Sequence, residues 1–323
     1  MSGEAEMWDG ALAEHASPPP LLQSWAWGEV QASSGWRVER LRLVRGATAS
    51  VQLRNFGRAQ EAYVPRGPVP ASVEAIDWLV AWARNAGIAR LVVDPETTQE
   101  IKEDLRERGF NRVPSIQPHH TRIVKMLPAT ELLASFRQGR RYNIRAGERR
   151  GVVVEEGKDA KELWRQSTAV ERRESIRLPS RAYYDLLLEL LPWCRTYTAF
   201  APDSHEALAT VLVARHAGRA YSLFAGRTGR RRELMGNDLA WWVAIRSAAE
   251  AGCTDFDLWG VPPPDTGPEH AWHGLGAFKA EFGGEVVSYA GAWELVLSPA
   301  GARMLNLERK ARAYIRGVKR NSP

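Results

Sequence analysis

Two stretches of the chain repeat one order of apolar and polar positions. The first reads IDWLVAWARNAG, IARLVVDPE, IKEDLRERGF and NRVPSI, and the second reads LAWWVAIRSAAEAG, CTDFDLWG, GLGAFKAEFGG and EVVSYAG. In each, a helix with tryptophan at helical spacing ends at a glycine, Gly87 or Gly252, which suits the position after a helix C-terminus. An apolar strand with an aspartate follows, Asp94 or Asp257, and then a second helix, a glycine and another strand. The shared texture predicts two copies of one αβ unit rather than a chance alternation of helices and strands.

Breaks rich in proline and glycine divide the chain into five predicted segments. They are a loose leader over 1–20, a first αβ domain over 21–127, a basic linking helix over 128–150, a second αβ domain over 151–298 and a basic C-terminal helix over 299–323. We therefore expect the α/β (α+β) class, with one mixed sheet in each domain.

The composition is that of a globular protein without a membrane span. The 323 residues are 44% hydrophobic and 25% charged, and the N-terminus lacks the apolar core of a signal peptide. No apolar run approaches the roughly 18 residues that a membrane helix needs. Two cysteines, Cys194 and Cys253, provide neither a disulfide framework nor a metal site, so we expect a cytoplasmic protein with no metal.

Arginine dominates a net charge of +6. In FRQGRRYNIRAGERRG, residues 136–151, Arg137, Arg141, Arg145 and Arg149 recur every fourth residue, so a helix would align them on one face. Like charges at this spacing repel one another, which a polyanionic partner would relieve. A solvated face neutralised by nearby glutamates is the alternative, and the pattern leaves both open.

A short segment near the C-terminus places an aromatic residue beside a single cation. In GLGAFKAEFGG, Phe278 precedes Lys279, and Gly283 and Gly284 end the segment. An aromatic ring beside a single cation is a suitable place for a charged substrate to bind. The alternative is that Phe278 belongs to the core and Lys279 to the solvated surface. Whether Lys279 lies in a substrate cleft or on the surface, we expect it to add little to the stability of the fold.

The stretch RRELMGNDLAWW resembles the turn by which GNAT acyltransferases hold the pyrophosphate of coenzyme A at a helix N-terminus. Arg231 and Gly236 have the spacing of that turn, but Leu234 replaces its inner glycine. A bulky side chain there is expected to keep a pyrophosphate away from the backbone, so the acyl donor should not be coenzyme A.

The chain resembles the FemABX family of aminoacyl-tRNA-dependent peptidyltransferases, which build the interpeptide bridge of peptidoglycan. The matching segments are LLQSWAWGEV, FRQGRRYNIRAGERRGVVV, ELMGNDLAWW, AGCTDFDLWGVPP and GLGAFKAEFGGEVVSYAGAWEL, of which FKAEFGG is the most specific. The resemblance implies two GNAT-like domains and a reaction that requires no cofactor, neither a metal nor a coenzyme. No long heptad stretch is present, so the coiled-coil arm of some members is not expected.

The resemblance also implies roles for individual residues. Lys279 matches a lysine that stabilises negative charge at the tRNA acceptor end, Phe278 an aromatic residue that packs on the terminal adenine, and Asp94 an aspartate near the reacting groups. The basic helix with Arg137, Arg141 and Arg145 would contact the tRNA.

A second group of residues corresponds to contacts with the precursor diphosphate. Trp27 lies in the N-terminal motif, but Gln31 stands where relatives carry a lysine, so the chain departs from the pattern there. A second contact falls on Arg177, with Tyr183 or Tyr184 nearby.

The implied partners are aminoacyl-tRNA and a UDP-linked or lipid-linked muropeptide precursor. We expect a monomer, and a lipid-linked acceptor would bring it to the membrane surface as a peripheral protein. Two other functions remain open: an acyl-coenzyme A dependent N-acyltransferase, and a polyanion-binding protein without catalysis.

Overall fold

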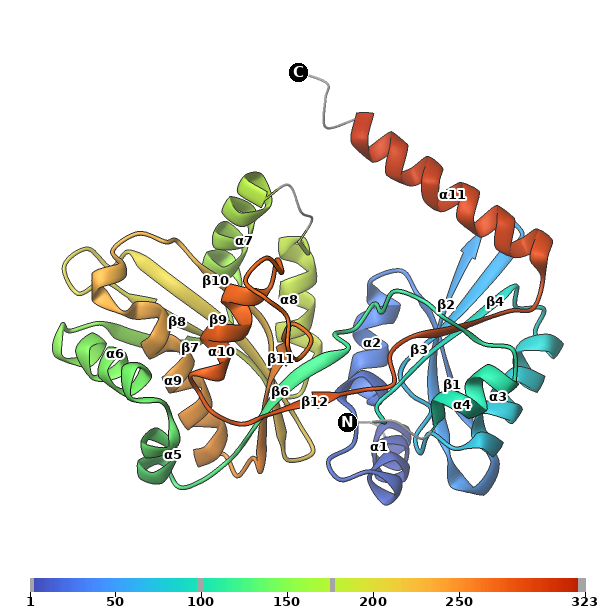
Figure 1. Ribbon diagram of the computed structural model, residues 1–323, viewed down its shortest axis with the longest axis horizontal. Helices are drawn as coiled ribbons and strands as arrows, with labels where there is room; N and C mark the ends of the chain where they lie inside the picture. The colour runs from blue at the N-terminus through green and yellow to red at the C-terminus, as the bar shows by residue number, and fades with distance from the viewer. Residues whose placement is uncertain (1–2, 98–100, 175–177, 319–323) are drawn as a thin grey trace. The chain divides into compact units, whose positions relative to one another are not determined.

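The chain folds around two mixed β-sheets, each in a unit of its own (Figure 1). The computed structural model describes residues 3–97, 101–174 and 178–318. Unit 1 consists of Met1–His119 and Tyr289–Pro323, and unit 2 consists of His120–Ser288.

Unit 1 takes its elements from both ends of the chain. They are α1 (Gly3–His15), α2 (Trp25–Ser33), β1 (Arg37–Arg42), β2 (Thr48–Phe56), β3 (Ala59–Arg66), α3 (Val73–Asn85), β4 (Arg90–Pro95), α4 (Ile101–Glu107), β5 (Asn111–Arg112), β13 (Trp293–Val296) and α11 (Pro299–Val318), with short 3₁₀ turns at Leu21–Gln23 and Val44–Gly46.

Unit 2 is formed by the continuous middle of the chain. Its elements are β6 (His120–Lys125), α5 (Ala129–Ser135), α6 (Gln138–Arg149), β7 (Val153–Gly157), α7 (Lys161–Glu174), α8 (Arg181–Leu190), β8 (Cys194–Phe200), β9 (Ala207–His216), β10 (Arg219–Arg227), α9 (Gly236–Glu250), β11 (Asp255–Gly260), α10 (His273–Ala280) and β12 (Glu285–Ser288), with a 3₁₀ turn at Arg232–Leu234.

Helix α3 shows how the sequence pattern forms the core of unit 1. The Ser72 hydroxyl caps its N-terminus by accepting a hydrogen bond from the backbone N–H of Ala75 at 3.2 Å, and Gly87 follows its C-terminus with φ +68°. Its buried face, which includes Ile76 and Leu79, packs in one cluster with the sheet. Helix α9 has the same place in unit 2 and buries Trp241, Trp242 and Ile245.

The two sheets share one strand order, which confirms the predicted α/β class with two mixed sheets. In unit 1, β1, β2 and β3 are antiparallel, β3 is parallel to β4, and β13 pairs antiparallel with β4 and β5. In unit 2, β8, β9 and β10 are antiparallel, β10 is parallel to β11, and β6 pairs antiparallel with β11 and β12. Only β7, at the edge beside β8, has no counterpart. The repeat that the sequence predicts is therefore present in the topology.

The predicted domain boundaries differ from the observed ones because each sheet takes one strand from beyond its own repeat. Strand β6 falls in the predicted first domain but pairs in the second sheet, and β13 falls in the predicted second domain but pairs in the first. The segment predicted as a linking helix, 128–150, is two helices that belong to unit 2, since Phe136 and Ile144 lie in its core.

Both terminal segments pack against unit 1, which differs from the prediction of a loose N-terminal leader. Residues 1–20 are not simply a loose leader, because Trp8 and Leu12 of α1 are buried, and the Trp8 indole donates a 2.8 Å hydrogen bond to the carbonyl of Gln23. In α11, Ala302 and Leu305 are buried, and Leu305 packs against Phe56 at the end of β2.

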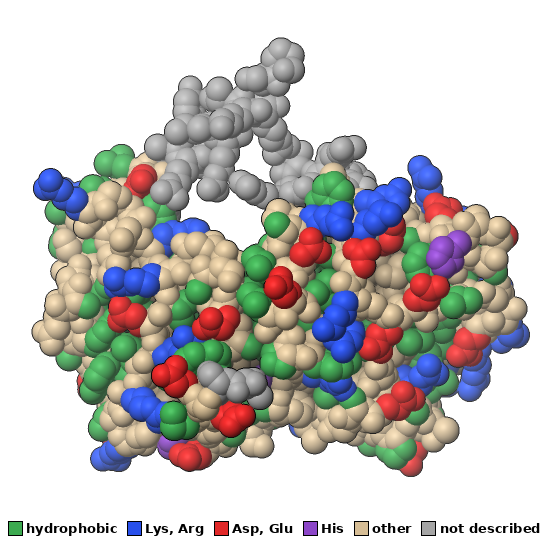
Figure 2. All heavy atoms as spheres, turned by 180° about the vertical axis from the view of Figure 1, so that it is seen from behind, with side chains coloured by type: hydrophobic (Ala, Val, Ile, Leu, Met, Phe, Trp, Pro, Cys, Tyr) green, Lys and Arg blue, Asp and Glu red, His purple; other side chains and the backbone are tan. Residues whose placement is uncertain are grey.

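Charged side chains of both signs are interspersed over the face drawn in Figure 2. Within the parts of the chain that the structure describes, no helix is long and apolar enough to cross a membrane.

Candidate functional site

Lys279 lies in the last turn of α10 with its side chain buried. The side chain is 6% exposed, and its ammonium donates a 2.7 Å hydrogen bond to the carbonyl of Gly260, at the end of β11. The tight packing of α10 against the preceding loop depends on Gly276, where a Cβ would lie 2.6 Å from the Pro262 ring. The expectation of an exposed or cleft lysine was wrong, because the side chain points into unit 2 toward β11.

The carboxylate of Asp257 lies near Lys279 and is itself fixed by β-sheet geometry. It accepts hydrogen bonds from the Thr121 hydroxyl of the neighbouring strand β6 and from the backbone N–H of Trp259, the latter at 2.7 Å. Trp259 has φ +63°, a left-handed conformation that is rare for a bulky residue. Burial lowers the pKa of Lys279 to about 8, and the negative charge of Asp257 opposes that shift.

This burial predicts a stability that depends on pH. Between about 8 and the ordinary lysine pKa of 10.5, the unfolded chain binds a proton at Lys279 that the folded chain has lost. The free energy of unfolding should therefore rise with pH across this window, by up to about 3 kcal/mol. Urea denaturation of the wild type and of Lys279→Met at several pH values isolates this contribution. Lys158→Met, at an exposed position, should keep the wild-type rise, and an equal rise in Lys279→Met would contradict the account.

Phe278 is half-buried in an aromatic cluster, so its predicted place in the core is partly correct. Its ring centroid lies 5.7 Å from that of Trp241 and 5.4 Å from that of Phe282. The guanidinium of Arg140, in α6, lies over both phenylalanine rings, at 4.2 Å from Phe278 and 4.6 Å from Phe282. It also donates a 3.1 Å hydrogen bond to the Phe278 carbonyl and pairs with the carboxylate of Asp238 in α9.

Arg140 packs against the candidate residue Phe278, and the sequence pattern did not single it out. It is 5% exposed, and burial lowers its pKa despite the attraction of Asp238. The fourfold arginine spacing marks the exposed face of α6, whereas Arg140 lies on the buried face. The signal that could have found Arg140 is its spacing of four and seven residues from Ile144 and Gly147, because all three lie on the buried face of α6.

The predicted tRNA-contacting arginines have different surroundings. Arg137 is exposed and pairs with Glu281 at 3.4 Å, whereas Arg141 donates hydrogen bonds to the backbone carbonyls of Ala134 and Phe136. Arg145 is exposed, as is Arg149 at the end of the helix. Arg141 therefore holds the turn between α5 and α6, and Arg145 and Arg149 are the members that extend into solvent.

The turn before α9 corrects the argument about coenzyme A. Leu234 is buried in the core of unit 2 and does not line the cavity of about 230 Å³ at the start of α9. Arginines line this cavity instead, including Arg227, Arg230 and Arg232. The Leu234 side chain thus leaves the helix N-terminus open, since the left-handed Met235 (φ +56°) turns the backbone before Gly236.

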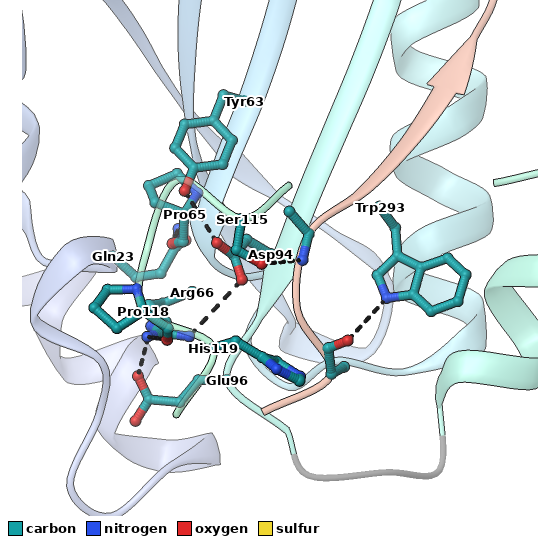
Figure 3. A network of polar contacts seen from close by, with 12 residues as sticks. Gln23, Tyr63, Pro65, Arg66, Asp94, Glu96, Ser115, Pro118, His119 and Trp293 are labelled. Carbon is teal, nitrogen blue, oxygen red and sulfur yellow. Dashed lines mark hydrogen bonds and ion pairs between the residues drawn. The ribbon is translucent and has the colours of Figure 1, made fainter. Parts of the chain in front are cut away.

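Asp94 lies at the end of β4 in unit 1, in a buried polar network (Figure 3). The Tyr63 hydroxyl donates to its Oδ2 at 3.2 Å, and the Arg66 guanidinium lies 3.8 Å from its Oδ1, which accepts no hydrogen bond. Arg66 also donates a 2.7 Å hydrogen bond to the Pro118 carbonyl and lies 4.0 Å from Glu96.

Burial controls the charges of this network. It raises the pKa of Asp94, and Arg66 partly opposes that shift. Burial acts to lower the pKa of Arg66, but the negative charges of Asp94 and Glu96 raise it, and the pKa of Arg66 lies above its ordinary value. Arg66 has φ +54° and is 3% exposed. The network is a fixed ion pair, and direct contact of Asp94 with a substrate would require its cover to move.

The predicted precursor contacts are divided between the units. Trp27 and Gln31 are both buried in α2 of unit 1. Tyr183, in the first turn of α8 in unit 2, is half-buried and lies edge-on to Phe224 with ring centroids 6.4 Å apart. Arg177 lies outside the described residues.

Residues 196–310, which include Phe278 and Lys279, match the model of the FemAB family. In this region the chain is similar to the FemAB family. A search of curated proteins finds no match.

Solved structures share the fold of this chain. The crystal structure of FemX is 17% identical, with a TM-score of 0.79 over 92% of this chain and 97% of FemX. L-PGS from Bacillus licheniformis is 13% identical, with a TM-score of 0.57 over 94% of this chain and 96% of L-PGS. A tandem GNAT protein from the clavulanic acid biosynthesis pathway is 12% identical, with a TM-score of 0.50 over 93% of this chain and 98% of its own. At these identities the similarity establishes the fold.

Proposed function

We propose that this protein transfers an amino acid from aminoacyl-tRNA to an amine of a peptidoglycan precursor muropeptide. The observation that carries the proposal is Lys279: it lies in the FKAEFGG segment of the FemAB match, and it is a buried cation hydrogen-bonded to the Gly260 carbonyl. The acceptor is UDP-linked or lipid-linked, and the site of action is the cytoplasm, where charged tRNA is found.

Lys279 has the properties of a group that stabilises a developing oxyanion. An aminoacyl ester is already activated, so attack by an amine requires positioning and charge stabilisation more than a strong base. The tetrahedral intermediate carries negative charge on the former carbonyl oxygen. Gly260 accepts one hydrogen bond of the ammonium and fixes its place, and the buried surroundings strengthen its attraction for an anion.

Phe278 and Asp94 have supporting roles in this proposal. The Phe278 ring, held by Arg140, offers a surface for the terminal adenine of the tRNA. Asp94 orients the attacking amine or accepts its proton, and Arg66 holds its carboxylate. Precursor contacts are assigned to Trp27 and Gln31, and to Tyr183 and Arg177, on the family pattern alone.

One observation favours a second candidate, an acyl-coenzyme A dependent N-acyltransferase. The arginine-lined cavity at the start of α9 is open, and helix N-termini bind pyrophosphate through free backbone N–H groups. Calorimetric titration separates the candidates. The proposal expects binding of aminoacyl-tRNA and no micromolar binding of acetyl-coenzyme A, and the opposite result would favour the second candidate.

The exposed arginines of α6 give a test of the tRNA contact. If Arg145 and Arg149 pair with phosphates, replacing both with alanine should lower the slope of log affinity against log salt concentration by about two units, one for each arginine. The measurement is tRNA binding at several salt concentrations. Arg84→Ala, at an exposed position of α3, serves as the control and should leave the slope unchanged. An unchanged slope in the double variant would reduce this face to a solvated surface.

A further inference from the structure

Helix α7 carries a buried amide that has no hydrogen-bond partner. Gln166 is 3% exposed, and neither its Nε2 nor its Oε1 makes a hydrogen bond. The side chain lies against Gly226 of β10, where a Cβ would come within 2.8 Å of the Gln166 Cβ. An unsatisfied buried amide is unfavourable, and in a native structure it requires an explanation.

Gln166 lines a cavity of about 800 Å³ in unit 2, at the ends of β8 and β10. An aromatic pair forms another part of its wall: Phe200 and His205 are stacked, with ring centroids 4.1 Å apart and planes within 6° of parallel. The His205 side chain is 69% exposed, so its outer face is a flat platform on which a further ring can stack.

The charges of the cavity wall are largely balanced. Its lining has three acids, Asp159, Glu162 and Glu206, and three bases, Lys161, Arg165 and Arg230. Glu162 pairs with Arg165 at 3.1 Å, and Glu206 with Arg230 at 3.9 Å. Such a wall suits a neutral, flat group with polar edges rather than a phosphate.

Arg230 also lines the smaller arginine-rich cavity at the start of α9. The larger cavity therefore adjoins a place where backbone N–H groups and arginines attract an anion. A neutral aromatic base in one cavity and a phosphate in the next is the arrangement of a nucleotide.

We propose that the Gln166 cavity binds an unpaired base of single-stranded RNA, cytosine or adenine, with an adjoining phosphate at the start of α9. Both bases carry an amino donor beside a ring-nitrogen acceptor, which the donor and acceptor of the glutamine amide match. The base stacks on His205, and the Gln166 side chain turns from Gly226 into the cavity to pair with it. This inference rests on the proposed function, which supplies the RNA as the unpaired acceptor end of tRNA.

The test compares hexacytidylate RNA with the same RNA lacking the 4-amino group of each base. Fluorescence anisotropy should give a wild-type affinity about five- to tenfold higher for hexacytidylate, and Gln166→Met should lose this preference. The salt dependence of RNA binding should be the same in Gln166→Met as in the wild type, because the substitution removes no phosphate contact. The matched control is Gln138→Met, at an exposed position of α6, which should keep the preference. His205→Ala, also at an exposed position, should weaken both RNAs equally through the loss of stacking.

Several outcomes overturn the proposal. They are equal wild-type affinity for the two RNAs, a preference retained in Gln166→Met, and a Gln166→Met protein that loses binding of the muropeptide precursor instead of RNA. If cytidine monophosphate or coenzyme A binds as tightly as the RNA, the cavity binds a base but the proposal that its occupant is RNA is wrong. Because no transfer is measured, a protein with this preference but no transfer activity contradicts only the proposed function.

Discussion

Replacing Lys279 with methionine should lower the rate of aminoacyl transfer by about a hundredfold or more, because the loss of one charge-stabilising group at an oxyanion has that scale. Methionine has a similar length and no charge, so the aromatic cluster beside it should remain packed. Single-turnover transfer from aminoacyl-tRNA to the precursor is the measurement. Lys158→Met, which removes an exposed lysine of the same unit, should transfer at the wild-type rate.

The pH dependence of the same reaction gives a sharper test of the role of Lys279. The ammonium form is the one that stabilises an oxyanion, so the wild-type rate should fall as pH rises through about 8, the pKa to which burial lowers this lysine. In Lys279→Arg the side chain keeps its charge at higher pH, so the fall in the transfer rate should begin at a higher pH than in the wild type. Near-normal transfer in Lys279→Met, or the same falling limb in Lys279→Arg, would remove Lys279 from the mechanism.

The second large effect concerns the stability of unit 1. Asp94→Asn should lower the free energy of unfolding by about 2–4 kcal/mol, because it leaves the buried guanidinium of Arg66 without its nearest anion. The asparagine amide also turns an acceptor into a donor that faces the donors of Arg66. Urea denaturation of the purified variants measures the loss.

Two further variants show whether the ion pair causes this loss. Arg66→Met combined with Asp94→Asn should be less destabilised than the two single changes added together, since no unpaired charge remains. Asp77→Asn breaks an exposed pair with Arg108 and should change stability by less than about 1 kcal/mol. Additive losses at Asp94 and Arg66 would show that the two side chains act independently.

Much of the fold followed from local patterns, because each unit repeats one order of helix, glycine and strand. Gly87 and Gly252 mark the same helix end in both units, with φ of +68° and +79°. The exchange of β6 and β13 between the repeats did not follow, since strand pairing between distant segments leaves no local signal in either strand. The domain boundaries were therefore wrong at both strands.

The sequence marks Phe278 and Lys279 as candidates but does not predict their surroundings. One short motif contains both Phe278 and Lys279. The burial of Lys279 depends on tertiary packing, because its ammonium binds the Gly260 carbonyl and Pro262 packs against α10 at Gly276. Leu234 was misjudged for a related reason. A turn motif specifies which residues are present, and only the backbone conformation at Met235 determines that the leucine points into the core.

The measurement that tests the central claim most directly is the mass of the precursor after incubation with the purified protein and a pool of charged tRNAs. The proposed function predicts a mass increase of one or more aminoacyl residues, which requires charged tRNA and is absent with deacylated tRNA. The proposed function would be contradicted if the mass of the precursor stays unchanged with charged tRNA and, in a separate incubation with acetyl-coenzyme A, rises by one acetyl group.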